Sequence, residues 1–379
     1  MVKRNSVRVA FLGLRGFPGV QGGVETHSEH LCPLLVDLGC DVDVIVRSAY
    51  QSAEFRGGWG GVRFKCLWSP KRKGLEAILH TFIGVLYAGL VSRPDVLHIQ
   101  AIGPALMTPL ARLLGLKVVV THHGPDYDRQ KWGRVGRMVL KLGERFGMRW
   151  ASSRIVISEV IREIVWQKHG VASTLIHNGV VLPEVPTTRR ALEKWGLLAG
   201  KYVLLVSRLV AEKRHLDLIA AFQAASLKNW HLVIVGSADH PDGYTRQVLD
   251  AASATPNVVC TGFQTGVALR ELYGHAGLFV LPSSHEGLPI AMLEALSYGL
   301  PVLASDIPAN LEVGLPARHY YPLGDVNGLS SKLGEFAGDE VTDKDREARR
   351  SWVMEKYDWQ AIAKQTFDVY REVVVKKIE

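Results

Sequence analysis

The sequence predicts an α/β protein of two domains, each built on a doubly wound parallel sheet, with a cleft between them. Its 379 residues exceed the roughly 250–300 residues that one hydrophobic core usually holds. Short β-branched runs alternate with helical stretches, and strands separated by helices form right-handed parallel units. The alternation stops in residues 175–190, where Asn-Gly and two prolines indicate a linker, and then restarts.

Each half contains its own series of strands and helices. In the first half we expect strands at 7–13, 41–47, 62–68, 95–100, 117–123 and 154–158, and helices at 23–37, 75–92 and 104–114. In the second half we expect strands at 202–207, 231–237, 257–262, 278–282 and 300–305, with a last helix from residue 359. In such sheets ligands bind beyond the carboxyl ends of the strands, so the residues after each strand are the candidates for chemistry.

The composition is that of an ordinary globular protein, with 47% hydrophobic and 22% charged residues. The four cysteines are scattered, without metal-ligand spacing, which predicts a reducing cytoplasm. The N-terminal segment lacks the apolar region of a secretory signal. The longest apolar stretch, 77–92, is interrupted by His80 and is short for a membrane span, so we expect a buried helix.

The net charge of +8 is unevenly distributed along the chain. Residues 129–154 hold eight Lys/Arg and one acid, and residues 134–150 combine cations at helical spacing with an apolar stripe. The stripe consists of Val135, Met138, Val139, Leu142 and Phe146. Such a helix can dock on anionic lipid at the inner face of the cytoplasmic membrane. The alternative is an ordinary solvated helix; no nucleic-acid partner is expected.

Two loops that follow strands in the first half are candidates for ligand binding or chemistry. The glycine-rich loop that reaches Gly22 and Gly23 feeds a helix, which suits a phosphate group, although a tight turn would also need glycine. His122 and His123 end another strand and are candidates for acid/base or metal-binding roles, although a lone histidine is more often structural. The Asp-x-Asp sequence at 126–128 has the form of a metal motif, but we expect no metal there, and residues 41–43 alternate as a strand.

Two segments after strands in the second half carry charges. Arg208 and Lys213 lie where a strand meets a helix and could neutralise a diphosphate. Glu286 precedes the next such helix, and Glu294 lies about two turns further on, where a carboxylate suits the vicinal hydroxyls of a ribose. The helix begins near Pro289, and its first N–H groups are available to an anion. By spacing alone, two surface glutamates would be the simpler interpretation.

Taken in order, these motifs resemble the retaining glycosyltransferases of the GT-B fold, family 4, whose signature is E-x7-E. The resemblance rests on the segment from Ser283 to Ser305, on SRLVAEK (207–213), on NGV (178–180), on the Gly-Gly loop and on the histidine before Gly124, and covers essentially the whole chain. The segments RGFPGVQGGVET and HHGPDYDRQKWG further resemble a bacterial surface-polysaccharide subgroup with rhamnosyltransferase-like members.

The resemblance implies a role for each matching residue. Glu294 would bind the ribose, Glu286 the transferred sugar, and Arg208 with Lys213 the diphosphate, while His123 would lie near the sugar and the developing charge. The implied catalytic residues are His123, Glu286, Arg208 and Lys213. The implied donor-binding set is Gly22, Gly23, Arg208, Lys213, Phe263, Glu286, Gly287, Leu288, Pro289, Ile290 and Glu294; the base is expected to be read largely by backbone at 262–264.

The resemblance also implies an organisation and an activity. The expected domains are an acceptor-binding domain at 1–180, a linker at 181–200, a nucleotide-sugar-binding domain at 201–357 and a crossover helix, 358–379, that returns to the first domain. The expected reaction moves a sugar from a UDP, GDP or dTDP donor to a lipid-linked or glycan acceptor by a metal-independent front-side mechanism, without a cofactor. The alternatives are a nucleotide-sugar epimerase of the same fold, a phosphorylase, which lacks a supporting lysine, and a non-catalytic nucleotide-sugar sensor.

Overall fold

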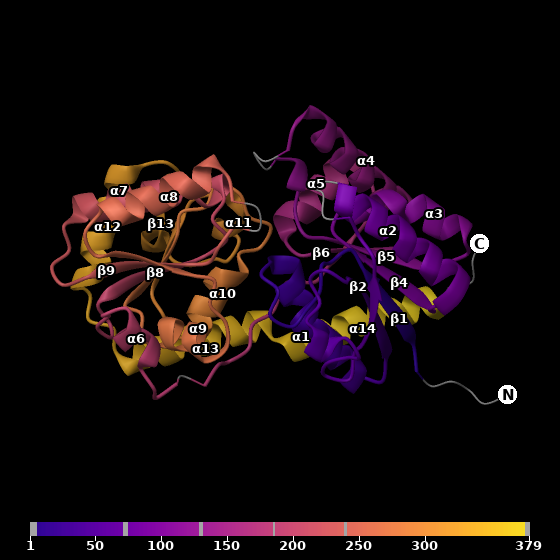
Figure 1. The fold of residues 1–379 in the computed structure, drawn as a ribbon, viewed down its shortest axis with the longest axis horizontal. Helices are drawn as coiled ribbons and strands as arrows, with labels where there is room; N and C mark the ends of the chain where they lie inside the picture. Colours follow the sequence, from indigo (N-terminus) through magenta and orange to yellow (C-terminus); the bar gives the residue numbers. More distant parts are fainter. Residues whose placement is uncertain (1–5, 71–74, 129–131, 185, 239–240, 376–379) are drawn as a thin grey trace. The chain divides into compact units, whose positions relative to one another are not determined.

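A computed structural model of the chain describes residues 6–70, 75–128, 132–184, 186–238 and 241–375. The chain forms two compact units (Figure 1): unit 1 comprises Met1–Asn178 and Trp359–Glu379, and unit 2 comprises Gly179–Asp358. Each unit is an α/β domain with a parallel sheet, which confirms the predicted fold class. The last helix belongs to unit 1 although unit 2 precedes it in the chain.

The sheet of unit 1 has seven parallel strands in the order β3-β2-β1-β4-β5-β6-β7. The strands are β1 (Arg8–Leu12), β2 (Asp41–Arg47), β3 (Arg63–Leu67), β4 (Val96–Gln100), β5 (Val118–His122), β6 (Ser153–Val156) and β7 (Thr174–Leu175). Six of them match predicted strands. The edge strand β7 was not predicted, because two residues show no alternation that could reveal a strand.

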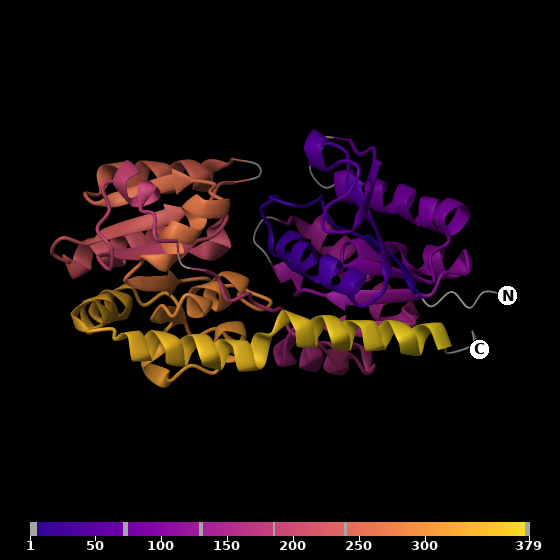
Figure 2. The same ribbon diagram turned by 90° about the horizontal axis from the view of Figure 1, so that it is seen from below.

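Helices cover both faces of this sheet (Figure 1). On one face lie α1 (Gly23–Asp37) and α14 (Trp359–Val375), and on the other lie α2 (Leu75–Tyr87), α3 (Thr108–Leu113), α4 (Arg134–Trp150) and α5 (Glu159–His169). The α14 helix runs beside α1 (Figure 2). Alternate strand residues such as Val9 and Phe11 join one buried cluster with Trp359 and Tyr370 of α14. This shared core explains why the C-terminal helix belongs to unit 1.

The stretch Leu75–Ser92 continues α2 into one π-helical turn at Ala88–Ser92. Among the described helices, this is the one whose length and apolar composition would allow it to cross a membrane. Of its residues 75–92, 39% are buried. One side packs on the sheet, since a Cβ on Gly84 would come within 2.5 Å of the Leu12 side chain. The expected buried helix is therefore only partly right, because Leu75, Ile78 and Phe82 are exposed.

The sheet of unit 2 has six parallel strands in the order β10-β9-β8-β11-β12-β13. The strands are β8 (Tyr202–Val206), β9 (His231–Val235), β10 (Val258–Gly262), β11 (Leu278–Leu281), β12 (Val302–Ser305) and β13 (Tyr320–Tyr321). The first five match predicted strands, and the two-residue β13 was again not predicted. In both units the strand order reverses between two central neighbours, β1 and β4 in unit 1 and β8 and β11 in unit 2.

Helices also cover both faces of the second sheet (Figure 1). One face carries α7 (His215–Ala225), α8 (Gly243–Ala254) and α12 (Val326–Gly338), and the other carries α6 (Arg190–Lys194), α9 (Gly266–Gly274), α10 (Ile290–Ser297) and α13 (Asp343–Tyr357); the short α11 (Pro308–Leu311) follows β12. Helices α12 and α13, which lie between the last expected strand and the last expected helix, were not predicted.

The segment 181–200 was predicted to be a linker, but the structure places it in unit 2. It contains α6, which packs against α9. The buried carboxylate of Glu271 on α9 accepts hydrogen bonds from the Ala191 backbone N–H, at 2.6 Å, and from the Thr188 hydroxyl. These hydrogen bonds give the backbone N–H of Ala191, at the start of α6, a partner, and they hold segment 181–200 against unit 2.

Candidate active site

Two loops of unit 2 meet where the strand order reverses, because β8 and β11 are neighbours in the sheet. The loop after β8 ends in a 3-10 turn, η5 (Ala211–Lys213), and the loop after β11 leads to α10. The Ser284 backbone N–H donates to the Glu212 carbonyl oxygen at 2.8 Å, and the Ser284 hydroxyl donates to the same oxygen at 3.2 Å. Residues far apart in sequence thus share one edge of the sheet, the edge at which such folds bind ligands.

Lys213 and Glu286 form an ion pair across these two loops, with Lys213 Nζ donating to Glu286 Oε1. Their side chains are only 16% and 12% exposed. A partly buried carboxylate costs free energy unless it is paired and hydrogen-bonded, and Lys213 supplies that pairing. Lys213 was predicted to bind a diphosphate and Glu286 a sugar. The ion pair between the two side chains was not predicted.

The loop that carries Arg208 is held by His215, a histidine that was not predicted to belong to the site. His215 Nε2 lies 2.9 Å from the Ser207 hydroxyl, and the His215 backbone N–H donates to the Tyr244 hydroxyl at 2.9 Å. Burial, and then the charge of Lys213, lower the pKa of His215 to about 3. His215 is therefore neutral and serves as a structural support, while Arg208 itself is only partly buried.

Glu294 is held in place by a tyrosine from the preceding helix. The residues beside it in α10, Met292, Leu293, Ala295 and Leu296, are buried, whereas Glu294 is partly exposed. Its Oε2 accepts a hydrogen bond from the Tyr273 hydroxyl at 2.9 Å, and the Tyr273 ring stacks on Tyr298 with centroids 5.2 Å apart. Burial, and then the Glu294 carboxylate, raise the pKa of Tyr273, so it remains a donor. No sequence signal linked Tyr273 to Glu294.

The remaining donor-site predictions of unit 2 lie at the same edge of its sheet. The α10 helix begins at Ile290, after Gly287, Leu288 and Pro289, and its first backbone N–H groups lack partners within the helix. Phe263 follows β10 directly and is 42% exposed. In the strand order β10 is separated from β8 by β9, so the structure places Phe263 two strands away from the Arg208 loop.

Gly22 and Gly23 begin helix α1 in unit 1, where Gly22 is the N-terminal cap. A Cβ on Gly22 would lie 2.1 Å from Glu25 Oε2 and 2.7 Å from Arg15 Nη2. Arg15 and Glu25 form an ion pair of 3.0 Å. Burial alone would raise the pKa of Glu25, but the charge and hydrogen bonds of Arg15 outweigh it and lower that pKa. Gly22 therefore lies close against this ion pair, and its role beside a donor phosphate stays a prediction.

The two adjacent histidines have different surroundings in the structure. Both nitrogens of the fully buried His122 are engaged, Nε2 with Glu144 Oε1 at 2.9 Å and Nδ1 with the Gly124 backbone N–H at 3.1 Å. His123 is partly exposed, and its Nε2 lies 2.7 Å from Gln100 Oε1. Burial, and then the nearby His98 and His122, lower the pKa of His123 to about 3. His123 therefore stays the candidate of the two.

Neither Asp-x-Asp sequence forms a metal cluster in the structure. Asp126–Asp128 is a short 3-10 turn around the buried Tyr127; residues 129–131 of the adjoining motif lie outside the described residues. Asp43, in strand β2, pairs with Arg63 at 2.7 Å. Within the described part of the chain, no three His, Cys, Asp or Glu side chains are grouped so that they could hold a metal ion.

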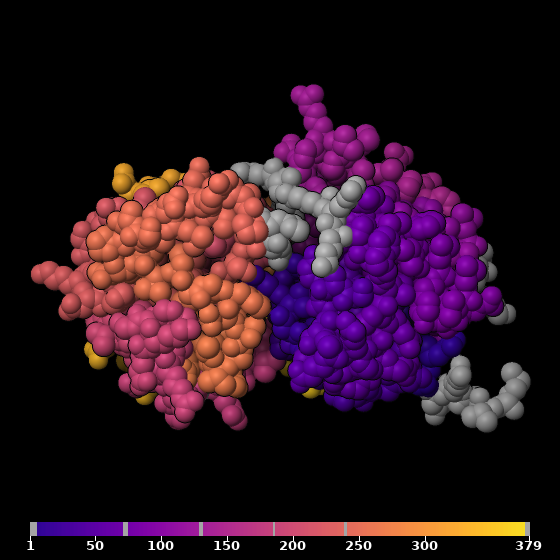
Figure 3. All heavy atoms as spheres, viewed as in Figure 1, coloured from indigo at the N-terminus to yellow at the C-terminus, as the bar shows by residue number. Residues whose placement is uncertain are grey.

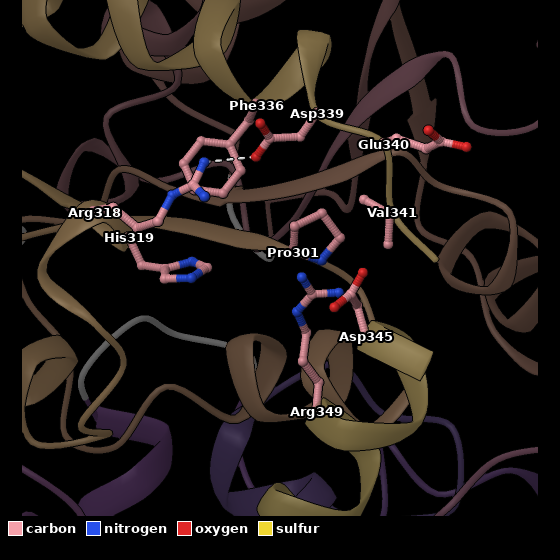
Figure 4. Close-up of a pocket in the computed structure, with 9 residues that line it drawn as sticks. All are labelled: Pro301, Arg318, His319, Phe336, Asp339, Glu340, Val341, Asp345 and Arg349. Atoms are coloured by element: carbon pink, nitrogen blue, oxygen red, sulfur yellow. Dashed lines mark hydrogen bonds and ion pairs between the residues drawn. The ribbon is translucent and has the colours of Figure 1, made fainter. Parts of the chain in front are cut away.

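A separate pocket of about 260 Å³ lies in unit 2, near the amino end of β12 (Figure 4). It is lined by Pro301, Arg318, His319, Phe336, Asp339, Glu340, Val341, Asp345 and Arg349. Arg318 pairs with Asp339 at 2.6 Å. None of the predicted site residues lines this pocket, and its charges are of both signs, so it is distinct from the candidate site at the carboxyl ends of β8 and β11.

Two family models match the chain, one in each half. Residues 21–183 match the model described as Glycosyltransferase Family 4, and residues 190–319 match the model described as Glycosyl transferases group 1. The two matches follow each other along the chain, as the two structural units do. The second match contains Arg208, Lys213, Glu286 and Glu294.

The chain is also similar to individual proteins. It is 26% identical to an alpha-maltose-1-phosphate synthase of Mycolicibacterium smegmatis, over 97% of this chain and 100% of that protein. It is 24% identical to the O-antigen chain mannosyltransferase B of Escherichia coli, over 56% of this chain and 58% of that protein. Its fold matches the crystal structure of Anabaena HepE in complex with UDP and glucose, with a TM-score of 0.80, 17% identity, and coverage of 97% of this chain and 100% of that one.

Proposed function

As the chain is a glycosyltransferase of the GT-B fold, we propose that it transfers a sugar, with retention of configuration, from a nucleotide diphosphate to a lipid-linked or glycan hydroxyl. We assign the reaction to the assembly of bacterial exopolysaccharide, capsule or O-antigen, a role supported by the similarity to an O-antigen mannosyltransferase. The observation that carries the proposal is the meeting of the Lys213 and Glu286 loops at the strand-order reversal of unit 2.

In the proposed reaction the acceptor hydroxyl attacks on the face from which the nucleoside diphosphate leaves, through an oxocarbenium-like state. Arg208 and Lys213 stabilise the leaving diphosphate, together with the backbone at the start of α10, while Glu294 holds the ribose. Glu286 binds the sugar hydroxyls, and when the donor arrives Lys213 is shared between Glu286 and the phosphate. Cations held in place before the reaction stabilise developing charge without reorganisation.

The nucleotide can be identified by thermal unfolding of the whole chain with UDP, GDP or dTDP and then with the corresponding sugar nucleotides. A nucleotide that binds only the folded state stabilises it by RT ln(1 + [L]/Kd), so at equal concentration the tighter-binding nucleotide raises Tm more. We expect UDP or GDP to raise Tm more than dTDP, since dTDP lacks one of the vicinal ribose hydroxyls that suit Glu294. Release of nucleoside diphosphate that depends on an acceptor would establish sugar transfer. Interconversion of the donor without an acceptor would establish an epimerase. Nucleotide binding with neither reaction would indicate a sensor.

We expect the transfer rate to survive treatment with EDTA and to change little when Mg²⁺ or Mn²⁺ is added. The reason is that Arg208, Lys213 and a helix N-terminus supply the positive charge that a metal would otherwise bring to the diphosphate. The measurement is initial rate after chelation and gel filtration, with and without each cation. A strict requirement for added cation would contradict this assignment and direct attention to Asp126 and Asp128.

We further propose that α4 contacts the inner face of the cytoplasmic membrane. The helix packs on unit 1 through small residues, since a Cβ on Gly143 would come within 2.2 Å of the Ile102 carbonyl oxygen. Val135, Met138 and Leu142, expected to lie along one stripe, remain 71%, 65% and 41% exposed. Arg134, Arg137, Lys141, Arg145 and Arg149 of the same helix are also exposed, and α4 lies at the molecular surface (Figure 3). Exposed apolar residues among cations fit an anionic lipid surface.

Vesicle co-sedimentation tests this contact with the whole chain. The double variant R137E/K141E should bind vesicles containing phosphatidylglycerol at least about tenfold more weakly than the wild type, because each cation near an anionic membrane contributes about 1 kcal/mol. The control K228E/K344E makes the same change in net charge at exposed positions of unit 2 and should bind as the wild type does. Equal loss in both variants would show that only net charge matters, and equal binding to pure phosphatidylcholine would rule out the electrostatic contact.

A further inference from the structure

A cluster of polar side chains surrounds His123 at the carboxyl edge of the unit 1 sheet. Gln100 ends β4 and His123 follows β5, its neighbour in the sheet, while His27 lies in the second turn of α1, just after Gly22 and Gly23. The strand order of unit 1 reverses between β1 and β4, and ligands of doubly wound sheets bind at such a reversal. Gln100 was not among the residues that the sequence singled out.

The bond between Gln100 and His123 determines which imidazole nitrogen carries the proton. Gln100 Oε1 lies 2.7 Å from His123 Nε2, and the Gln100 side chain is fully buried. An amide oxygen only accepts, so Nε2 must be the protonated nitrogen and Nδ1 must carry a lone pair. The opposite amide orientation would place an N–H against Nε2 and force the proton to Nδ1.

We propose that Gln100 is a positioning residue that holds His123 as the neutral Nε2–H tautomer, leaving Nδ1 as a hydrogen-bond acceptor for a hydroxyl of the transferred sugar. This inference rests on the proposed function, since it assumes that a sugar lies beside His123. The Gln100 Nε2 amide group is buried and has no partner among the described residues. A bound hydroxyl or a water that accepts from this amide would satisfy it and would reinforce the orientation.

A second histidine closes the other side of the His123 ring. The rings of His27 and His123 meet edge to face, with centroids 5.0 Å apart. His27 is itself fixed, because its Nδ1 lies 2.9 Å from Asn178 Oδ1 within the buried interior. An imidazole between a rigid ring and a buried amide has little freedom to rotate, so its orientation is set before any ligand arrives.

The charged and titratable groups around His123 favour the neutral ring. His98 and His122, from the two strands, lower the pKa of His123, and His27, from α1, lowers the pKa of His98. Burial and this repulsion hold the pKa of His123 at about 3, so the ring stays neutral from pH 5 to 9. A neutral His123 ring is compatible with an oxocarbenium-like state beside it. A protonated ring would repel the positive charge that develops on the sugar.

The first test reads the tautomer directly and needs no donor. In the whole chain labelled with ¹⁵N-histidine, imidazole ¹⁵N shifts separate a protonated nitrogen from an unprotonated one, and the variant H123N identifies the His123 signals among the 14 histidines. We expect Nε2–H in the wild type at pH 7 and a mixture of tautomers in Q100L. A wild-type Nδ1–H ring, or an unchanged Nε2–H ring in Q100L, would overturn the proposal whether or not the chain proves to transfer sugar.

The second test follows the rate of UDP or GDP release from whichever of UDP-glucose and GDP-mannose the wild type turns over. Q100L should lower kcat about 10- to 100-fold with the donor KM within about threefold, because misplacing a group at the reacting centre mainly affects the transition state. In Q100E the new carboxylate favours the imidazolium and raises the pKa of His123. The kcat of Q100E should therefore fall as pH drops through that raised pKa, where the wild-type rate is flat.

The matched control is T121V, which removes the hydroxyl 2.7 Å from His98 Nε2 on the neighbouring buried strand. It changes a histidine contact at similar depth and leaves the Gln100 amide in place, although Thr121 is the register partner of Gln100 in the neighbouring strand. We expect T121V to retain the wild-type pH profile and His123 tautomer, with thermal unfolding measured for every variant. The same loss of kcat and the same flat pH profile in T121V, Q100L and Q100E would reduce Gln100 to a packing role.

Discussion

Replacing Glu294 with alanine is expected to weaken binding of the nucleotide by at least about 100-fold while the protein remains folded. Hydrogen bonds to a charged group contribute about 1.5–3 kcal/mol each, so losing two ribose contacts costs about 3 kcal/mol or more, and each 1.4 kcal/mol is a factor of ten in Kd. The buried part of α10 does not depend on Glu294, which is partly exposed beside buried apolar neighbours. Isothermal titration with UDP or GDP gives Kd directly.

The assignment to the ribose can be separated from a structural role of the same carboxylate. Y273F removes the hydroxyl 2.9 Å from Glu294 Oε2 but keeps the carboxylate, so we expect a much smaller loss than in E294A. The wild type should also discriminate against the 2′-deoxy form of its nucleotide, and E294A should lose that discrimination. Unchanged nucleotide affinity in E294A, or equal losses in E294A and Y273F, would refute ribose binding by Glu294.

Replacing Lys213 with alanine is expected to lower kcat about 10²–10³-fold, as removal of one fixed donor to a developing oxyanion does in other enzymes. The diphosphate carries this charge, so affinity for the nucleoside diphosphate should fall while affinity for the nucleoside changes little. Lys213 already holds a partly buried carboxylate, Glu286. K213A therefore removes both the cation beside the diphosphate and the ion pair with Glu286. The contributions of these two losses to kcat and to nucleotide affinity must be measured separately.

A double-mutant cycle with E286Q separates them. The two residues are in direct contact, so their effects on kcat and Tm should not be additive. We expect K213R, which keeps the charge, to recover part of the rate, and E286Q to weaken sugar-nucleotide binding while leaving binding of the nucleoside diphosphate nearly intact. If K213A and E286Q give the same loss for the nucleoside diphosphate, then Lys213 only positions Glu286.

Much of the fold was predictable because strand and helix periodicity is local. Ten of the thirteen strands fall within the expected ranges, and β6 (Ser153–Val156) begins one residue before its range. The two that were missed are two-residue edge strands. The linker prediction failed for 181–200 because turn residues indicate only local chain reversal, whereas the Glu271 carboxylate, about 80 residues later, holds that segment to unit 2.

The candidate site was predictable to a smaller degree. Residues at strand ends could be selected, since parallel strands place their carboxyl ends at one edge, and Arg208, Lys213, Glu286 and Glu294 all lie there. The residues that hold these side chains in place could not be recognised from any motif or periodicity in the sequence. Nothing in the neighbourhood of Tyr273, His215 or Gln100 in the sequence distinguishes a buried partner from an ordinary polar residue.

The sequence by itself determined the two α/β domains and the loops in which the charged residues lie, because these depend on hydrophobic period and on turn residues within short windows. Only the tertiary structure decided that Lys213 pairs with Glu286, 73 positions away, that Tyr273 holds Glu294 and that Gln100 faces His123. The physical reason is that strand order, which places β8 beside β11 and β4 beside β5, arises from packing of the whole chain and leaves no pattern in any single segment.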